Sequence, residues 1–134
     1  MAKKFAVTIF SLAVLAALGY YLTTGVVKPV STDLSVVGQG RPVLALAYEN
    51  FSPTSAEALE RLREVRADYE SRLQIVVADL GTPQGRSFAN RYGVGEGQAV
   101  FLDPAGQAVS IARVPGDAQG LRSLLDKELA MLES

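Results

Sequence analysis

Residues 41–134 alternate between two patterns of apolar and polar positions. Short apolar or β-branched runs, typical of buried strands, are separated by longer segments in which apolar residues recur every three or four positions, as in amphipathic helices. The predicted elements, in chain order, are a strand at 42–48, a helix at 55–72, a strand at 73–80, a helix at 82–92, strands at 99–102 and 107–114, and a helix from Asp117 onward.

This β-α-β-α-β-β-α order predicts an α/β fold, a three-layer sandwich in which helices cover a small central sheet. Alternating strands and helices suggest parallel neighbours joined by right-handed crossovers, and the final β-β hairpin adds an antiparallel edge. Two apolar stripes should face the sheet, and their members are Leu59, Leu62, Val65 and Tyr69 in one helix and Leu121, Leu124, Leu125, Leu129 and Leu132 in the other.

An uncharged run of 23 residues, 5–27, precedes this domain. As a helix it would extend roughly 34 Å, enough for the ~30 Å hydrocarbon core of a bilayer. Lys3 and Lys4 come before it, so the positive-inside rule places the N-terminus in the cytoplasm and the rest of the chain outside. The expected membrane contacts include aromatic residues along the run and at its far end, namely Phe5, Phe10, Tyr20 and Tyr21.

The predicted organisation is therefore an N-terminal transmembrane anchor at 1–28, a linker at 29–40 rich in Pro, Gly, Ser and Thr, and a domain at 41–134. A short piece of structure at 34–37 is compatible with the linker. The expected location is a bacterial inner membrane, with a single pass and a periplasmic domain. A cleaved signal peptide is the alternative, although the run is longer than an ordinary signal h-region and lacks an Ala-x-Ala-like site.

Composition excludes much familiar chemistry. The chain has neither Cys nor His, so thiolate nucleophiles, zinc–thiolate sites and Ser–His–Asp catalysis are ruled out. No metal, cofactor or catalytic residue is predicted. Residues 29–134 carry ten basic and fourteen acidic residues, a net charge of −4, which gives no basic surface for nucleic acid.

Three stretches resemble one known family. The segment 40–55, Gly-Arg-Pro-Val-Leu-Ala-Leu-Ala-Tyr-Glu-Asn-Phe-Ser-Pro-Thr-Ser, resembles the strand and loop of thioredoxins, with Phe51 at the family's Trp and Ser52 and Ser55 at its two redox cysteines. Arg-Tyr-Gly-Val at 91–94 and Phe-Leu-Asp-Pro-Ala-Gly at 101–106 resemble two further thioredoxin motifs. The resemblance covers residues 34–130 and implies a thioredoxin-like fold.

The sequence departs from thioredoxins where their chemistry lies. Both redox cysteines are replaced by serine, whose hydroxyl is too weak an acid to act as the thiolate. The family's buried acid falls on Leu46, and its cis-proline falls on Gln98 or Gly97, depending on the direction of counting. We therefore expect a redox-inactive member of the thioredoxin-like superfamily and not an enzyme.

The loop at 51–55, which corresponds to the redox loop of thioredoxins in this resemblance, has two interpretations. In the structural one, Ser52 caps a helix with Pro53 at its first position, or Thr54 caps it with Glu57 closing a capping box. In the functional one, the loop forms a groove for a protein partner, beside which a carboxylate at Glu49 could pair with a basic group. The candidate contact residues are Phe51, Ser52, Pro53, Thr54, Ser55, Gly97 and Gln98. Phe51 could also pack under the loop as core.

Three function classes follow from these observations. The first is a membrane-anchored, redox-inactive module that binds a protein partner as an accessory subunit or assembly factor of a membrane complex. The second is an enzyme, either a thiol–disulfide oxidoreductase whose cysteines have been replaced by serine or a hydrolase using Ser52, for which the sequence offers no evident base. The third is a structural tether.

Overall fold

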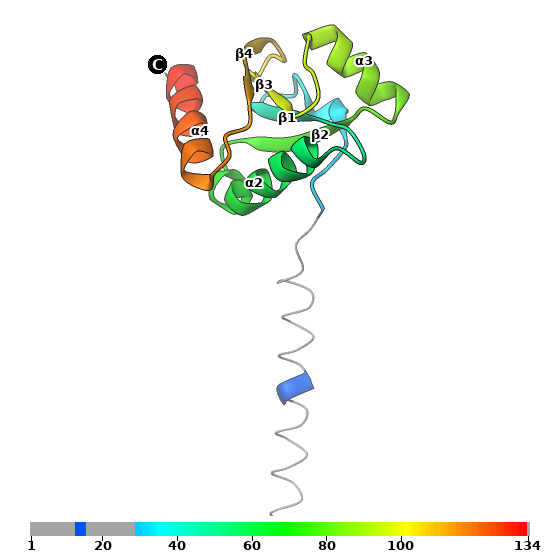
Figure 1. Ribbon diagram of the computed structural model, residues 1–134. Coiled ribbons are helices and arrows are strands. Elements are labelled where there is room, and N and C mark those ends of the chain that lie inside the picture. Colours follow the sequence, from blue (N-terminus) through cyan, green and yellow to red (C-terminus); the bar gives the residue numbers. More distant parts are fainter. Residues whose placement is uncertain (1–12, 16–28, 134) are drawn as a thin grey trace, which may run out of the picture.

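A four-stranded sheet lies between two helical layers in the computed structural model, which describes residues 13–15 and 29–133. Helices α2 and α4 cover one face, and α3 with a short 3-10 helix covers the other (Figure 1). This arrangement confirms the predicted α/β sandwich. The elements are η1 (Leu34–Val36), β1 (Val43–Tyr48), α2 (Pro53–Tyr69), β2 (Gln74–Asp79), α3 (Pro83–Tyr92), β3 (Gln98–Leu102), β4 (Ala108–Arg113) and α4 (Ala118–Glu133).

The strand order is β2-β1-β3-β4. β1 and β2 are parallel, as predicted, and β3 and β4 form the predicted antiparallel hairpin. The expected parallel relation between β1 and β3 is wrong, because β3 runs antiparallel to β1 with Leu46 opposite Ala99. The last residues of β2 and the first residues of β3 both lie beside the end of β1. The connection through α3 therefore returns to the same end of the sheet, and β3 runs in the opposite direction to β2.

Alternate residues of the strands feed two separate apolar cores, as a sheet covered on both faces requires. On one face, Leu44, Leu46 and Phe101 pack against the stripes of α2 and α4. The predicted stripe residues Leu62, Val65, Tyr69, Leu121, Leu125 and Leu129 are all buried there, and Leu59, Leu124 and Leu132 are partly buried. On the other face, Val43, Val76, Val100 and their neighbours pack against Phe88 and Val94.

The observed boundaries of α2 differ from the predicted ones, because a capping residue sets its start and a turn sets its end. α2 begins at Pro53, two residues before the predicted start, because Ser52 caps it. It ends at Tyr69, since the backbone N–H groups of Arg72 and Leu73 both donate to the Tyr69 carbonyl and turn the chain toward β2. α3 ends at Tyr92, and its C-cap is Gly93, whose φ of 70° lies in the left-handed region that favours glycine.

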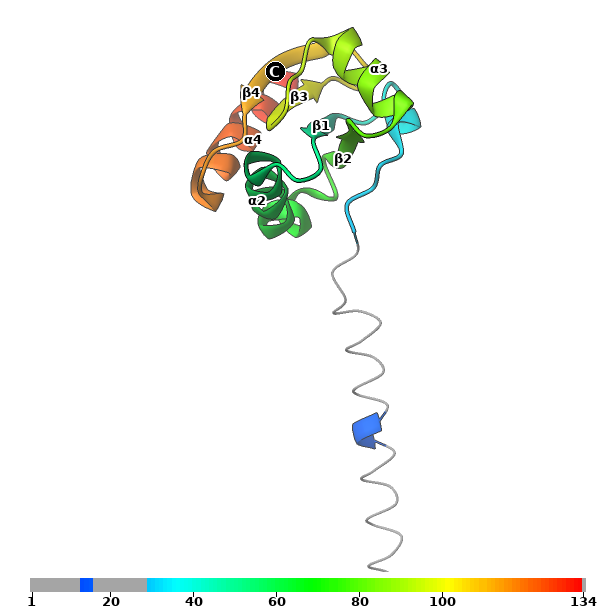
Figure 2. The same cartoon turned by 45° about the vertical axis from the view of Figure 1, so that its right-hand side comes forward.

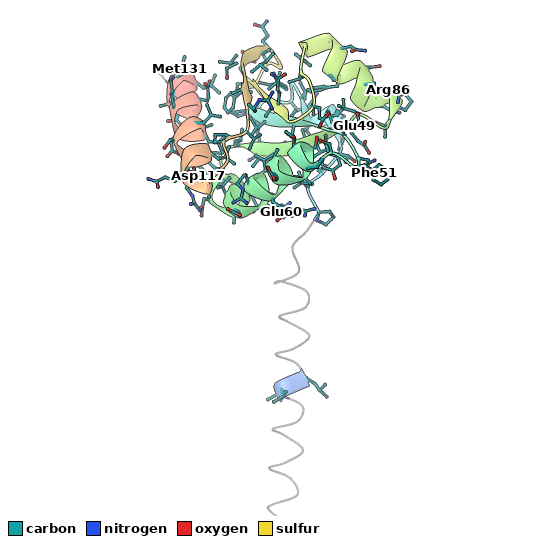
Figure 3. The ribbon with its side chains drawn as sticks, viewed as in Figure 1. Glu49, Phe51, Glu60, Arg86, Asp117 and Met131 are labelled. Carbon is teal, nitrogen blue, oxygen red and sulfur yellow. The ribbon has the colours of Figure 1, made fainter. Side chains whose placement is uncertain are left out.

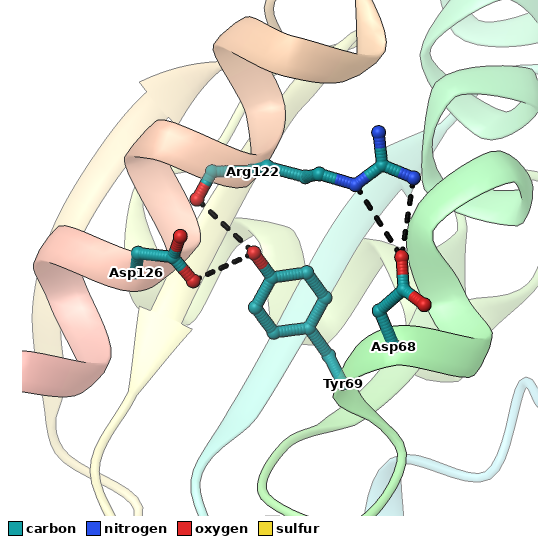
Figure 4. Close-up of polar contacts among 4 residues, drawn as sticks. All are labelled: Asp68, Tyr69, Arg122 and Asp126. Atoms are coloured by element: carbon teal, nitrogen blue, oxygen red, sulfur yellow. Dashed lines mark hydrogen bonds and ion pairs between the residues drawn. The ribbon is translucent and has the colours of Figure 1, made fainter.

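A polar cluster joins α2 to α4 (Figure 4). The Tyr69 hydroxyl donates to Asp126 Oδ1 at 2.7 Å and lies 3.2 Å from the Arg122 carbonyl oxygen. Arg122 in turn contacts Asp68 Oδ2 through Nε and Nη2, at 3.3 and 3.1 Å. Burial, then the hydrogen bond to Asp126 and its negative charge, raises the pKa of Tyr69 from 10.0 to about 12.

Tyr69→Phe is expected to lower the free energy of unfolding by about 1 kcal/mol at neutral pH, because it removes a hydroxyl that is bonded in a nearly buried site. The raised pKa means that the folded state favours the neutral phenol. Its contribution is therefore complete below pH 10 and is lost as pH rises from 10 toward about 12. Urea titrations between about pH 8 and 11 should show this loss in the native chain and a flatter dependence in Tyr69→Phe. If the free energy of unfolding fell equally with pH in the two proteins, the raised pKa could not belong to Tyr69.

Gly85 sets how closely α3 approaches β2. A Cβ atom placed on Gly85 would lie 1.8 Å from the Asp79 carbonyl oxygen and 2.4 Å from the Asp79 carbonyl carbon. That carbonyl is fixed, since it accepts from the Thr82 backbone N–H at 3.0 Å and from the Thr82 hydroxyl at 2.8 Å. Only glycine fits at this contact.

The segment 29–40, predicted as a linker, is packed on the domain from its second residue. Val30 is 8 % exposed and belongs to the core beneath α2. Ser31 pairs with Val76 in a parallel bridge, and its carbonyl accepts from the Val77 N–H at 2.8 Å. η1 occupies 34–36, within the piece of structure predicted at 34–37. The outer edge of β2 is thereby covered.

The predicted membrane anchor falls almost entirely outside the described residues, and so do its aromatic residues Phe5, Phe10, Tyr20 and Tyr21. Within that run, 13–15 alone are described, and they are helical. Over 13–15 and 29–133, no helix is both long and apolar enough to cross a membrane.

Candidate partner-binding site

The loop between β1 and α2 is a tight turn that displays an aromatic ring. The Ser52 N–H donates to the Glu49 carbonyl at 3.3 Å, which closes a β-turn over residues 49–52. Phe51 occupies its third position with φ at 65°, where glycine or asparagine is usual. Its relative accessibility is 103 %, so the ring packs against nothing. This excludes Phe51 as a core residue.

Left-handed backbone costs an L-residue roughly 1–2 kcal/mol, and full exposure of a phenyl ring gains nothing in folding. Strained backbone conformations of this kind concentrate at binding and catalytic sites. Figure 3 shows Phe51 projecting from the domain beside Glu49. The combination of strain and exposure makes Phe51 the most informative residue of the loop.

Ser52 and Ser55 both serve the local structure. Ser52 is the N-cap of α2, with its Oγ accepting from the Ser55 N–H at 3.2 Å and Pro53 in the first turn. Of the two predicted capping arrangements, the structure therefore adopts the one based on Ser52. Ser55 is fully buried, and its Oγ accepts from the Glu49 N–H at 3.0 Å. The second serine thus fastens the Phe51 turn to α2.

A second tight turn, at 95–98, faces the first. The Gln98 N–H donates to the Gly95 carbonyl at 3.0 Å, and Gln98 Oε1 accepts from the Gly95 N–H at 2.9 Å. Gly97 has φ at 76°, and a Cβ there would lie 2.7 Å from Thr54 Cγ2. Glu96 joins the two turns, because the Ser52 hydroxyl donates to Glu96 Oε1.

Glu96 places a carboxylate at the N-terminus of α2, where the helix dipole favours negative charge. It also gives Ser52 a carboxylate acceptor, which the sequence did not indicate. A carboxylate is ordinarily a much weaker base than an imidazole, and the Ser52 oxygen already accepts the capping bond. The pair is therefore better suited to holding the turns together than to activating a nucleophile.

The resemblance to thioredoxins places that family's cis-proline at Gln98 or Gly97. No cis peptide bond occurs among the described residues. The Gly97 N–H donates to the Ala47 carbonyl at 3.0 Å, and the Gly97 carbonyl lies 3.5 Å from the Val114 nitrogen. The backbone of Gly97 is therefore engaged inside the domain, while Leu46, at the position of the family's buried acid, is 0 % exposed in the apolar core.

The predicted contact residues separate into two groups. Thr54 and Gly97 border a hollow of about 490 Å³, together with Glu57, Ala58, Arg61, Arg113, Val114, Pro115 and Gly116. Phe51, Ser52 and Gln98 do not line that hollow. Phe51 instead projects from the adjoining turn, and exposed carboxylates at Glu49 and Glu96 lie on the two turns around it. The accessible surface of the site is thus an aromatic ring with acidic neighbours.

Other candidates from the sequence have structural roles. Asp79 Oδ1 accepts from the Gly81 N–H at 2.8 Å, and Asp103 Oδ1 accepts from the Ala105 and Gln107 N–H groups at 2.9 Å each. Both carboxylates therefore stabilise turns. In the part of the chain that the structure describes, no cluster of acidic residues could hold a metal ion.

Sequence reasoning overlooked Glu96 and Val30. Glu96 lies 44 residues after its partner Ser52, in the stretch 93–97 where every second residue is glycine. Val30 lies among Pro, Ser and Thr residues that are typical of linkers. No pattern within either segment identifies its contact, because both contacts are made by tertiary packing.

Comparison with known proteins agrees with the fold at the level of structure. No protein-family model matches the sequence, and no curated protein matches it either. Solved structures do match, and the two described in the next paragraph are thioredoxin-like proteins. The order β-α-β-α-β-β-α, the sheet order and these similarities together define a thioredoxin-like fold.

Two structures illustrate the similarity. An uncharacterised thioredoxin-like protein from Clostridium perfringens, solved in solution, is 20 % identical with a TM-score of 0.61, over 71 % of this chain and 76 % of that one. The crystal structure of Trxlp from Edwardsiella tarda EIB202 is 18 % identical with a TM-score of 0.57, over 66 % of this chain and 84 % of that one. At such identities the similarity establishes the fold.

Proposed function

We propose that this protein is a redox-inactive, membrane-anchored module of thioredoxin-like fold that binds a protein partner, as an accessory subunit or assembly factor of a membrane complex. The observation that carries the proposal is Phe51, fully exposed at a left-handed φ on a turn fastened by Ser55. The uncharged run at 5–27 supports the anchor, with the N-terminus cytoplasmic and the domain periplasmic in a bacterial inner membrane.

The partner should offer an apolar pocket flanked by basic groups. Buried aromatic anchors dominate many protein interfaces, and Phe51 is presented with little conformational freedom because hydrogen bonds close its turn on both sides. The carboxylates of Glu49 and Glu96 on the neighbouring turns favour cationic groups around that pocket. Co-purification from membranes in mild detergent, comparing the native chain with Phe51 variants, tests the proposal.

Restoring cysteine at both positions, Ser52→Cys with Ser55→Cys, is expected to give little disulfide reductase activity. Thiolate formation at position 52 would be opposed by the Glu96 carboxylate, which contacts that position. By the resemblance to thioredoxins, Leu46 stands at the buried acid of that site and Gln98 or Gly97 at its cis-proline. Insulin reduction, measured beside an ordinary thioredoxin, should be at least about tenfold slower, as expected for a thiol whose pKa is raised by one unit or more.

Adding Glu96→Gln to the double-cysteine variant supplies the matched control. It removes the charge and keeps the size, so reduction should become faster if the carboxylate suppresses the thiolate. Activity near that of thioredoxin in the double-cysteine variant itself would favour the alternative, a thiol–disulfide oxidoreductase whose cysteines have been replaced.

A further inference from the structure

Two residues separate the folded domain from the uncharged run. The run ends at Val27, and Val30 is already part of the core at 8 % exposure. Ser31, the next residue, is held to β2 by the hydrogen bond from Val77. Lys28 and Pro29 alone lie between these segments, so the chain offers no free linker of useful length.

This spacing limits how far the domain stands from a bilayer. From Val27 to Val30 the chain reaches at most ~11 Å when fully extended. The polar headgroup layer on each side of a bilayer is roughly 5–7 Å thick. With the run spanning the hydrocarbon core, the face of the domain around residue 29 lies at the headgroups.

That face adjoins the Phe51 turn. Pro29 and Val30 border a hollow of about 190 Å³ together with Tyr48 and Leu59, and with Thr32, Arg63, Val77 and Asp79. Tyr48 is the last residue of β1, directly before the turn at 49–52. Residue 29 is therefore close to the end of β1 from which the Phe51 turn continues. In Figure 2, α2 and the segment that leads into η1 both lie on the lower side of the domain.

We propose that the partner recognised by Phe51 is a segment at the membrane surface of another membrane-bound protein, and not a freely diffusing exported protein. This inference rests on the proposed anchor and partner-binding function. The short connection holds the Phe51 turn beside the bilayer and limits the directions in which the turn can face. The complementary surface must therefore lie in the same shallow layer next to the lipid headgroups.

The absence of cysteine from the chain makes the geometry measurable, because one introduced thiol can be labelled uniquely. Asn50→Cys marks the Phe51 turn, which follows the end of β1. Ala105→Cys marks the exposed β3–β4 turn, which lies beside the start of β1, at the opposite end of the strands. Each full-length variant carries a donor dye and is reconstituted in phosphatidylethanolamine–phosphatidylglycerol vesicles with acceptor-labelled headgroups. Energy transfer should be clearly stronger from position 50 than from position 105.

Inserting about 12 Gly and Ser residues after Lys28 adds roughly 20 Å of mean reach. Transfer from position 50 should then fall toward that from position 105. The same insertion between Ala2 and Lys3 is the matched control and should change nothing. Equal transfer from both positions in the uninserted protein, or no effect of the insertion after Lys28, would overturn the proposed placement.

A photoreactive group on Asn50→Cys then identifies the class of partner in native membranes. The cross-linked partners, once identified, should be proteins that remain in the membrane when membranes without cross-links are washed with alkaline carbonate, and the yield of cross-links should decrease when the spacer is inserted after Lys28. Products found only with proteins released by the wash would overturn the inference. The proposed function fails separately, if Phe51→Gly leaves the cross-links unchanged, and this result would not alter the energy-transfer measurements.

Discussion

Gly85→Ala is expected to destabilise the domain by about 3 kcal/mol or more, at or beyond the upper end of ordinary overpacking. The added Cβ would lie 1.8 Å from the Asp79 carbonyl oxygen, well inside van der Waals contact. Asp79 cannot withdraw, because Thr82 is bonded twice to that carbonyl and β2 is paired to β1. α3 must instead move away from β2, which opens the core around Phe88. The melting temperature should fall by roughly 12–24 °C.

Gly116→Ala is the matched control for that experiment. A Cβ on Gly116 would meet nothing within 4 Å, and its φ is not in the left-handed region. The variant should be unchanged or more stable by up to about 1 kcal/mol, because alanine restricts the unfolded chain. Thermal unfolding followed by circular dichroism compares the melting temperatures of both variants with that of the native chain. A loss of less than about 1 kcal/mol in Gly85→Ala would mean that α3 and β2 are less closely packed than described.

Phe51→Gly is expected to weaken partner recovery at least about 30-fold, the equivalent of the ~2 kcal/mol or more that a buried aromatic anchor contributes. The same change should leave the free energy of unfolding unaltered or raise it by up to about 1 kcal/mol, since glycine accepts the left-handed φ without strain. Phe51 makes no packing contact to lose, at 103 % exposure. Opposite effects on binding and stability are characteristic of a residue kept for recognition.

Quantitative co-purification and urea titration of the same preparations measure both effects. Ile111→Thr serves as the control for loss of an exposed apolar side chain, because Ile111 is 43 % exposed on β4, away from the two turns. Its partner recovery should match that of the native chain. Unchanged recovery in a folded Phe51→Gly variant would show that the partner contacts another face of the protein.

The sequence predicted what depends on local patterns. The apolar stripes of α2 and α4, the capping serine and the β3–β4 hairpin were all recognisable, since each rests on residues close together in the sequence. The resemblance to thioredoxins added the expectation of the fold. Periodicity could not give the direction of β3 relative to β1, because that depends on whether the connection through α3 crosses to the other end of the sheet or returns to the same end.

The candidate site was only partly predictable for the same reason. The residues of the Phe51 turn are contiguous, so the sequence identified them. The exposure and left-handed backbone of Phe51 depend on the turn closed by Ser52 and on Ser55, which is buried beneath it. The role of Glu96 depends on a contact across 44 positions. Sequence thus located the loop, and tertiary packing determined what the loop displays.

The parallel bridge between Ser31 and Val76 has a mechanical consequence. Tension arriving through residue 29 would act first on the Val77–Ser31 hydrogen bond and on the burial of Val30, at the outer edge of the sheet. These contacts would detach one after another before force reached the pairing of β1 with β2. Detachment of residues 30–40 would then lengthen the tether under tension, while β1 and the Phe51 turn that follows it keep their shape.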